Sequence, residues 1–159
     1  MDQSASNIIL LVDDEEMVVT SIKSFLTLET DYEVVAFTSP KEALEYVREN
    51  KVDLVISDYL MPDMDGIEFL ANVKTLQPEA TRVLLTGYAD KENAIKAIND
   101  VGLYQYIEKP WENDELKLVI RNGLEKRILL KRLQDKISEV NKAHDELISV
   151  QKEILKAFA

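Results

Sequence analysis

Residues 8–14 read Ile-Ile-Leu-Leu-Val-Asp-Asp, an uninterrupted apolar run followed directly by two carboxylates. A short run with β-branched residues and no polar alternation is typical of a strand covered on both faces, as strands in parallel sheets are. The run is too short to span a bilayer or to serve as the apolar region of a signal peptide. It therefore predicts a buried strand with acidic residues at its carboxyl end.

The same pattern recurs along the first part of the chain. Four further apolar runs are Val34–Phe37, Leu54–Ile56, Val83–Leu85 and Tyr104–Ile107. Segments with apolar residues at helical spacing separate the runs, and Ser39 followed by Pro40 is a helix start with Ser39 as the N-cap. Repeated strand–helix alternation implies right-handed crossovers, so we expect an α/β fold with a doubly wound parallel sheet.

Charge and composition exclude several classes of protein. The 159 residues hold 19 Lys and Arg against 30 Asp and Glu, a formal charge of −11. Residues 1–112 carry nine basic and 22 acidic side chains, net −13, and residues 113–159 carry ten and eight, net +2. DNA contacts need a concentrated positive field, so we expect no direct DNA binding by this chain and no membrane partner. With no cysteine, disulfide scaffolds and thiol catalysis are excluded, which fits a cytoplasmic protein.

Polar residues stand just after most of the predicted strands. Asp13 and Asp14 follow the first run, Asp58 the third, Thr86 the fourth and Lys109 the fifth. Because ligands of open parallel sheets bind beyond the carboxyl ends of the strands, we expect these side chains to meet at one edge. Neighbouring carboxylates repel one another unless a cation lies among them, and hard oxygen donors suit Mg²⁺. The sequence therefore predicts a Mg²⁺ site.

This donor set suits phosphoryl transfer to an aspartate. Asp58 would lie between the Asp13/Asp14 pair and Lys109, so we assign it as the nucleophile that attacks phosphorus. Lys109 would neutralise charge on the phosphoryl group, and Thr86 would donate a hydrogen bond to one of its oxygens.

Together these residues form a recognisable set. With the stretch 58–66 (Asp-Tyr-Leu-Met-Pro-Asp-Met-Asp-Gly), Thr86-Gly87-Tyr88-Ala89 and residues 106–110, the chain resembles the receiver domain of two-component response regulators. The resemblance covers about residues 7–122. It implies a flavodoxin-like fold with strand order 2-1-3-4-5. It also implies that Asp58 accepts phosphate from a phosphohistidine on a sensor histidine kinase or phosphotransfer protein.

The resemblance also implies ligands and a switch. Mg²⁺ would be held by Asp14 and Asp58 directly, by Asp13 through water, and by the backbone carbonyl of Leu60. Thr86 would move toward the phosphoryl group and Tyr106 would turn inward, a two-state repacking that phosphate biases. The bond between Lys109 and Pro110 would be cis.

Two other functions compete with a phosphorylation-switched signalling protein. A Mg²⁺-dependent phosphohydrolase with an aspartyl nucleophile would place that residue after the first strand, commonly with a second Asp two residues on. Here Asp13 and Asp14 are adjacent and the fitting nucleophile follows the third strand, which favours the receiver. The third hypothesis is a structural dimeriser that keeps a vestigial site. We expect a signalling phosphoacceptor, not an enzyme.

The end of the chain has a different organisation. From Leu124 onward there is neither glycine nor proline, which favours one long helix. Asn113 is expected to cap it, and the residues that would pack it on the sheet are Leu116, Val119, Ile120 and Leu124. We therefore divide the chain into a receiver at 1–122 and an extended helix at 123–159.

Beyond Leu124 the spacing of apolar residues changes to alternating steps of three and four. The positions are Leu130, Leu133, Ile137, Val140, His144, Leu147, Gln151, Ile154 and Phe158. This heptad pattern predicts a parallel coiled-coil homodimer through residues 124–158, and the alternative is an exposed linker helix. A wider apolar face near the end, at Ile148, Val150, Leu155 and Ala157, favours either a four-helix assembly or continuation into an output module. His144 is expected to set register and oligomeric state rather than to carry phosphate.

Overall fold

The computed structural model describes residues 7–158, apart from the side chains of Tyr88, Ala97 and Ile98. The motif residue Tyr88 thus lies outside the described side chains. The chain separates into two compact units, residues 1–124 and 125–159.

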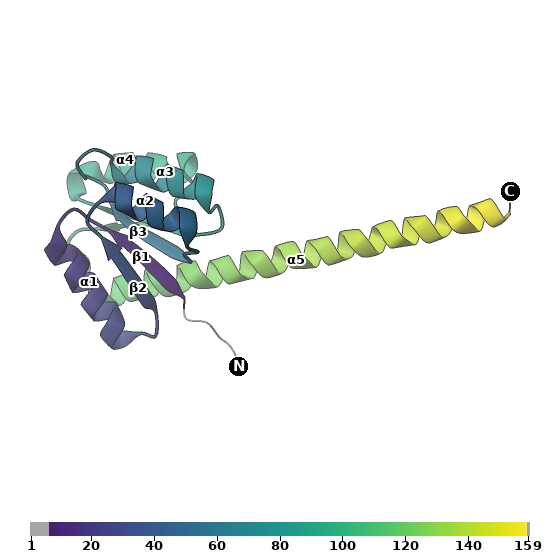
Figure 1. The fold of residues 1–159 in the computed structure, drawn as a ribbon, viewed down its shortest axis with the longest axis horizontal. Helices are drawn as coiled ribbons and strands as arrows, with labels where there is room; N and C mark the ends of the chain where they lie inside the picture. Colours follow the sequence, from purple (N-terminus) through teal and green to yellow (C-terminus); the bar gives the residue numbers. More distant parts are fainter. Residues whose placement is uncertain (1–6, 159) are drawn as a thin grey trace. The chain divides into compact units, whose positions relative to one another are not determined.

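A sheet of five parallel strands forms the centre of the described part of the first unit, in the order β2-β1-β3-β4-β5. Figure 1 labels its strands β2, β1 and β3, which are neighbours in the sheet. The strands are β1 (Ile8–Val12), β2 (Glu33–Phe37), β3 (Leu54–Asp58), β4 (Thr81–Thr86) and β5 (Gln105–Glu108). The predicted flavodoxin-like order is confirmed. β3 and β4 run further than their apolar runs, because Asp58 pairs with Leu85 and Thr86 with Glu108 across the sheet.

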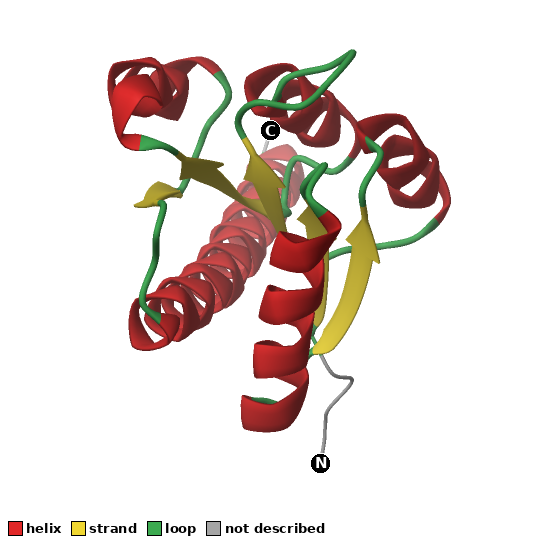
Figure 2. Cartoon of the chain, turned by 90° about the vertical axis from the view of Figure 1, so that its left-hand side faces the viewer, coloured by secondary structure: helices red, strands yellow, loops and turns green. Residues whose placement is uncertain are grey.

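Helices lie on both faces of this sheet (Figure 2). They are α1 (Glu16–Glu29), α2 (Pro40–Glu49), α3 (Gly66–Leu76), α4 (Lys91–Asp100) and α5 (Asn113–Ala157), with a 3₁₀ turn at Tyr88–Asp90. One apolar cluster joins the sheet to α2, α3 and α4, and the other joins it to α1 and the first turns of α5. Leu116, Val119, Ile120 and Leu124 are all buried in the second cluster, as expected.

The helix ends agree with the sequence in one case and differ in another. Ser39 caps α2, accepting a hydrogen bond from the Glu42 amide at 3.3 Å. The cap expected at Asn113 is wrong by one residue. The Leu116 amide donates to the Glu112 carbonyl at 3.0 Å, so the helical bonding begins before Asn113 and gives that residue a helical backbone.

A glycine allows α5 to approach the sheet closely. A Cβ atom at Gly123 would come within 3.0 Å of the Thr81 methyl and 3.1 Å of a Leu54 methyl. The Thr81 hydroxyl donates to the Gly123 carbonyl at 3.0 Å. The last helical glycine of the chain is therefore explained by packing within the first unit.

The second unit is the remainder of α5, a helix of 45 residues in all, close to the length expected from Asn113 to Phe158. The aliphatic residues of its heptad pattern are between 48% and 61% exposed. None of the helices in the described part of the chain combines the length and apolar composition needed to cross a membrane.

Candidate functional site

Three carboxylates meet where β1 and β3 end. Asp13 and Asp14 follow β1, and Asp58 is the last residue of β3, its neighbour in the sheet. One oxygen from each carboxylate lies within 4.8 Å of the other two. Asp13 is 2% and Asp58 7% exposed, whereas Asp14 is open to solvent. The carboxylates expected at one edge of the sheet thus form a single half-buried cluster.

Lys109, which directly follows β5, joins this cluster. Its ammonium lies 2.9 Å from Asp58 Oδ1 and 3.1 Å from Asp13 Oδ2. Its amide donates to the Thr86 carbonyl at 2.8 Å, which ties the residue to the end of β4, and the bond to Pro110 is cis. One ammonium therefore bridges two of the three carboxylates.

Burial and charge change the proton affinity of these groups. Burial raises the pKa of Asp58, and the charge of Asp14 adds to this, while the hydrogen bond and charge of Lys109 oppose it. Burial also raises the pKa of Asp13, although a hydrogen bond from the Glu15 amide at 2.9 Å favours its ionised form. Burial alone would lower the pKa of Lys109, but its bonds to Asp58 and Asp13 outweigh burial and raise it. The negative charges are thus incompletely compensated by the lysine.

The remaining expected site residues lie near this edge without joining the ionic cluster. Thr86 is fully buried, and its hydroxyl donates to the Gly87 carbonyl at 3.1 Å. Tyr106 is half-buried and packs against the apolar cluster under α2, α3 and α4. Leu60 lies in the loop after β3 with its side chain 61% exposed.

Sequence reasoning missed the contribution of Gly66, which it treated only as part of the motif. A Cβ atom at Gly66 would overlap the backbone carbonyl of Asp58, and the Gly66 amide donates to the Tyr59 carbonyl at 2.7 Å. Before it, Asp63 has a φ of 71° in a turn closed by the Met64 amide and the Pro62 carbonyl, and Asp65 caps α3. A glycine at the first position of a helix, directly after a cap, was the available signal of close backbone contact.

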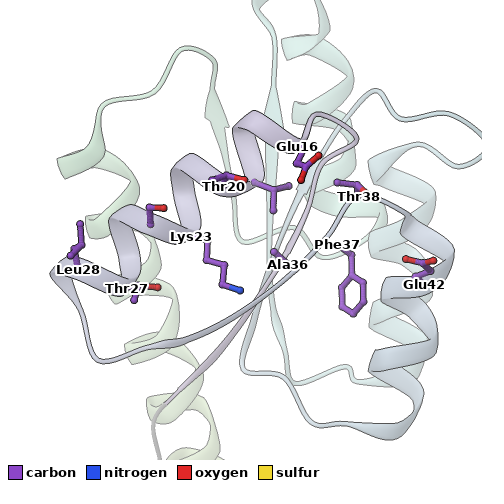
Figure 3. Close-up of a pocket in the computed structure, with 11 residues that line it drawn as sticks. Glu16, Thr20, Lys23, Thr27, Leu28, Ala36, Phe37, Thr38 and Glu42 are labelled. Carbon is purple, nitrogen blue, oxygen red and sulfur yellow. The ribbon is translucent and has the colours of Figure 1, made fainter.

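A separate hollow lies between α1 and the end of β2 (Figure 3). Its volume is about 670 Å³. Lys23, Thr20 and Thr27 line it from the helix, and Ala36 and Phe37 from the strand. No residue of the carboxylate cluster lines it, so it is distinct from the candidate site.

Residues 9–121 match the model of the response regulator receiver domain family. The chain belongs to this family. The match covers β1 from Ile9 onward, the other four strands, and every residue of the carboxylate and lysine cluster.

Individual relatives agree with this assignment. The hydrogenase transcriptional regulatory protein HoxA of Cupriavidus necator is 35% identical over 117 residues, 74% of this chain and 24% of that protein. The response regulator protein VraR of Staphylococcus saprophyticus is 33% identical over 158 residues, 95% of this chain and 75% of that protein. The chain therefore spans about a quarter of the length of the first curated relative and three quarters of VraR.

A solved structure has the same fold. The signal receiver domain of an HD domain-containing protein from Pseudomonas fluorescens superposes with a TM-score of 0.73 at 36% identity. The superposition covers 77% of this chain and 98% of that domain. The receiver is thus the part of the chain shared with this structure.

Proposed function

We propose that Asp58 accepts a phosphoryl group from a phosphohistidine of a sensor histidine kinase or phosphotransfer protein in the cytoplasm, in a Mg²⁺-dependent reaction. The observation that carries the proposal is the cluster at the edge of the sheet. Asp58 lies 2.9 Å from Lys109 and shares a carboxylate triad with Asp13 and Asp14. In this proposal Asp58 is the nucleophile, Lys109 the fixed cation, and Asp13 and Asp14 the two further anionic ligands that act around one phosphoryl group.

The donors present fit Mg²⁺. Three carboxylates and one ammonium leave the cluster with excess negative charge, and hard oxygen atoms are the ligands that Mg²⁺ prefers. We assign direct ligation to Asp14 and Asp58, a water-mediated contact to Asp13, and a further ligand to the backbone carbonyl of Leu60. Bound Mg²⁺ supplies positive charge for the phosphoryl oxygens and relieves repulsion among the carboxylates.

The residues of the chain divide the chemistry among them. A carboxylate oxygen of Asp58 forms a bond to phosphorus while the bond from phosphorus to the donor imidazole nitrogen breaks, and the electron pair stays on that nitrogen. Lys109 holds the ionised carboxylate before transfer and interacts with a phosphoryl oxygen afterwards. The absence of a side chain at Gly66 leaves room for the backbone carbonyl of Asp58, which a Cβ atom there would overlap.

Phosphate would then bias a switch through Thr86 and Tyr106. The Thr86 hydroxyl, now bonded to the Gly87 carbonyl, would exchange that acceptor for a phosphoryl oxygen. Tyr106 is only half-buried, so it has room to pack further inward once Thr86 moves. A downstream partner would recognise the altered surface of the receiver.

Two surfaces support partners for this function. Met17, 85% exposed at the start of α1, and Leu60, 61% exposed after β3, are close in sequence to Asp14 and Asp58 and offer apolar contacts to a phosphodonor protein. Residues 124–158 would join two copies of the chain as a homodimer. Neither surface implies turnover of free phosphate esters, and we propose a signalling phosphoacceptor rather than a phosphohydrolase.

Labelling tests the assignment of Asp58. Incubation with acetyl phosphate and Mg²⁺ is expected to add one phosphoryl group by intact mass, and EDTA is expected to prevent it. Asp58→Asn should abolish the label, whereas Asp63→Asn, an exposed carboxylate in the following loop, should retain it. An equal yield in Asp58→Asn would contradict the proposal. Multiple turnover on a generic phosphomonoester would favour the phosphohydrolase.

A further inference from the structure

The exposed stripe on the second unit is defined by nine positions, which we call the seam. Its a positions are Leu130, Ile137, His144, Gln151 and Phe158, and its d positions are Leu133, Val140, Leu147 and Ile154. The aliphatic members are about half exposed, and Phe158 is 86% exposed. A helix with such a stripe needs a covering surface of matching period.

A second copy of the same helix fits the seam in size. Burying one aliphatic side chain removes on the order of 60–100 Å² of apolar surface, so seven apolar seam residues in each of two copies remove roughly 1,000 Å². Flanking residues bring the total toward the ~1,200–2,000 Å² typical of stable interfaces. The surface is therefore sufficient for a homodimer.

The residues beside the seam do not oppose self-association. Positions e and g from Gln134 to Ala157 carry one charged residue, Lys136, and are otherwise uncharged. The charged residues of this stretch stand mainly at b, c and f, on the outer face of a two-stranded coil. No row of like charges would therefore face its copy.

The polar members of the seam distinguish the two possible directions of pairing. Both polar residues, His144 and Gln151, occupy a positions, and all four d positions are aliphatic. In an antiparallel coil, residues at a positions face residues at d positions of the other helix. His144 and Gln151 would therefore face aliphatic side chains in every register, and their buried polar groups would have no partners. In a parallel coil in register, each faces its own copy and a hydrogen bond can form.

We infer that residues 130–158 of two copies form a parallel, in-register coiled coil whose direction and register are set by His144 and Gln151. This inference rests on the proposed homodimer and deepens it. A shift of one heptad in the parallel arrangement would also place His144 opposite Ile137 or Gln151, so the polar layers disfavour slipped registers as well.

Cysteine cross-linking in the full chain tests direction, because the sequence contains no native cysteine. Leu133→Cys and Leu147→Cys are prepared as separate variants and oxidised. In the parallel arrangement each residue meets its own copy, so both variants should cross-link, exceeding the outward-facing control Ser149→Cys by about tenfold. An antiparallel register can bring at most one of the two positions onto itself, so cross-linking of only one overturns the inference.

A second measurement separates failure of the inference from failure of the dimer. Sedimentation at tens of micromolar is expected to show a dimer, and a monomer would overturn both the dimer and its direction. If the chain is a dimer but neither cysteine variant cross-links, the parallel direction is contradicted and the homodimer is not. Labelling of Asp58 depends on neither result.

The role of the polar layers has its own readout. The double variant His144→Leu, Gln151→Leu should stay associated but lose directional preference, so that cross-linking of the cysteine variants falls by at least half. Unchanged cross-linking in that background would show that the polar layers do not set direction.

Discussion

The two parts of α5 bury their apolar residues to opposite extents. Leu116 and Ile120 are fully buried against the sheet, whereas Leu133 and Val140 are 56% and 61% exposed. Both parts carry regular apolar stripes on one continuous helix, so local helix formation does not distinguish them. The first part is therefore stabilised by its own domain, while the second requires an added surface.

The largest expected effect comes from a charge placed in the seam. Ile137→Asp would bury two carboxylates in one layer of the dimer without cations beside them. We expect the dissociation constant to rise at least about a hundredfold, or about 3 kcal/mol. Sedimentation equilibrium measures the constant, and phosphoryl labelling should be unchanged because Asp58 belongs to the other unit.

Ser138→Asp is the matched control for that change. It adds the same charge one residue away, at an outer b position of the heptad. Its dissociation constant should remain close to that of the parent chain. Equal weakening by both variants would mean that net charge, rather than the seam, governs association.

The second effect concerns close backbone packing in the receiver unit. Gly66→Ala would force its methyl group against the carbonyl of Asp58, and we expect a loss of about 1–3 kcal/mol in the free energy of unfolding. Urea denaturation measures the loss, and the labelling yield of Asp58 should fall with it. Gly87→Ala is the control, since a Cβ there meets only Asp90 Oδ2 at 3.8 Å. Equal losses in both variants would contradict the packing argument.

A smaller effect, opposite in sign, is expected at the carboxylate cluster. The pKa of Asp58 is raised by burial, so its ionised form is less favourable in the folded chain than in the unfolded one. In EDTA at neutral pH, Asp58→Asn should therefore stabilise the chain by about 0.5–2 kcal/mol. Thermal unfolding measures the change, and Mg²⁺ should stabilise the parent chain more than the variant.

The sign of the pH dependence follows from the same shift. A carboxyl whose pKa is raised in the folded state binds its proton before the unfolded chain does as pH falls. The parent chain thus gains stability relative to Asp58→Asn as pH falls through the folded-state pKa toward 3.8, the unfolded value. The greater stability of Asp58→Asn over the parent chain should therefore decrease as pH falls through that range. A growing advantage would show that Lys109 outweighs burial.

Much of the fold was predictable because local pattern and sheet position agree. β1 matches its apolar run, and the parallel sheet follows from βαβ connectivity. The strand order was implied by the family resemblance. The ends of β3 and β4 were not predictable, since Asp58 and Thr86 are polar and join the strands through pairing with neighbours. The contacts of Arg82 were not predictable from the sequence either. This buried residue in β4 donates to carbonyls of Val101, Ala80 and Gly102, contacts that no local pattern reveals.

The charged cluster was predictable from the sequence, but its further contacts were not. Polar residues at strand ends, in the order of a known family, pointed to Asp13, Asp14, Asp58 and Lys109, which the structure brings together. Their roles, and that of Thr86, stay predictions. The bond of the Thr86 hydroxyl to the Gly87 carbonyl was not predictable, because a hydroxyl rotates toward whichever acceptor its surroundings offer. The backbone contact at Gly66 was also missed, since it depends on how α3 packs against β3.

The smallest effect compares one substitution in the two units. Ser39→Ala removes the oxygen that accepts from the Glu42 amide and should cost about 0.5–1 kcal/mol of receiver stability. Ser138→Ala lies in the middle of α5 on the outer face, where alanine is the better helix former, and should stabilise that segment by up to about 0.5 kcal/mol. Thermal melts at several concentrations separate the units, because only the midpoint of the associated segment should depend on concentration. If both substitutions acted in the same direction, or if the receiver midpoint moved with concentration, the two units would not be independently stabilised.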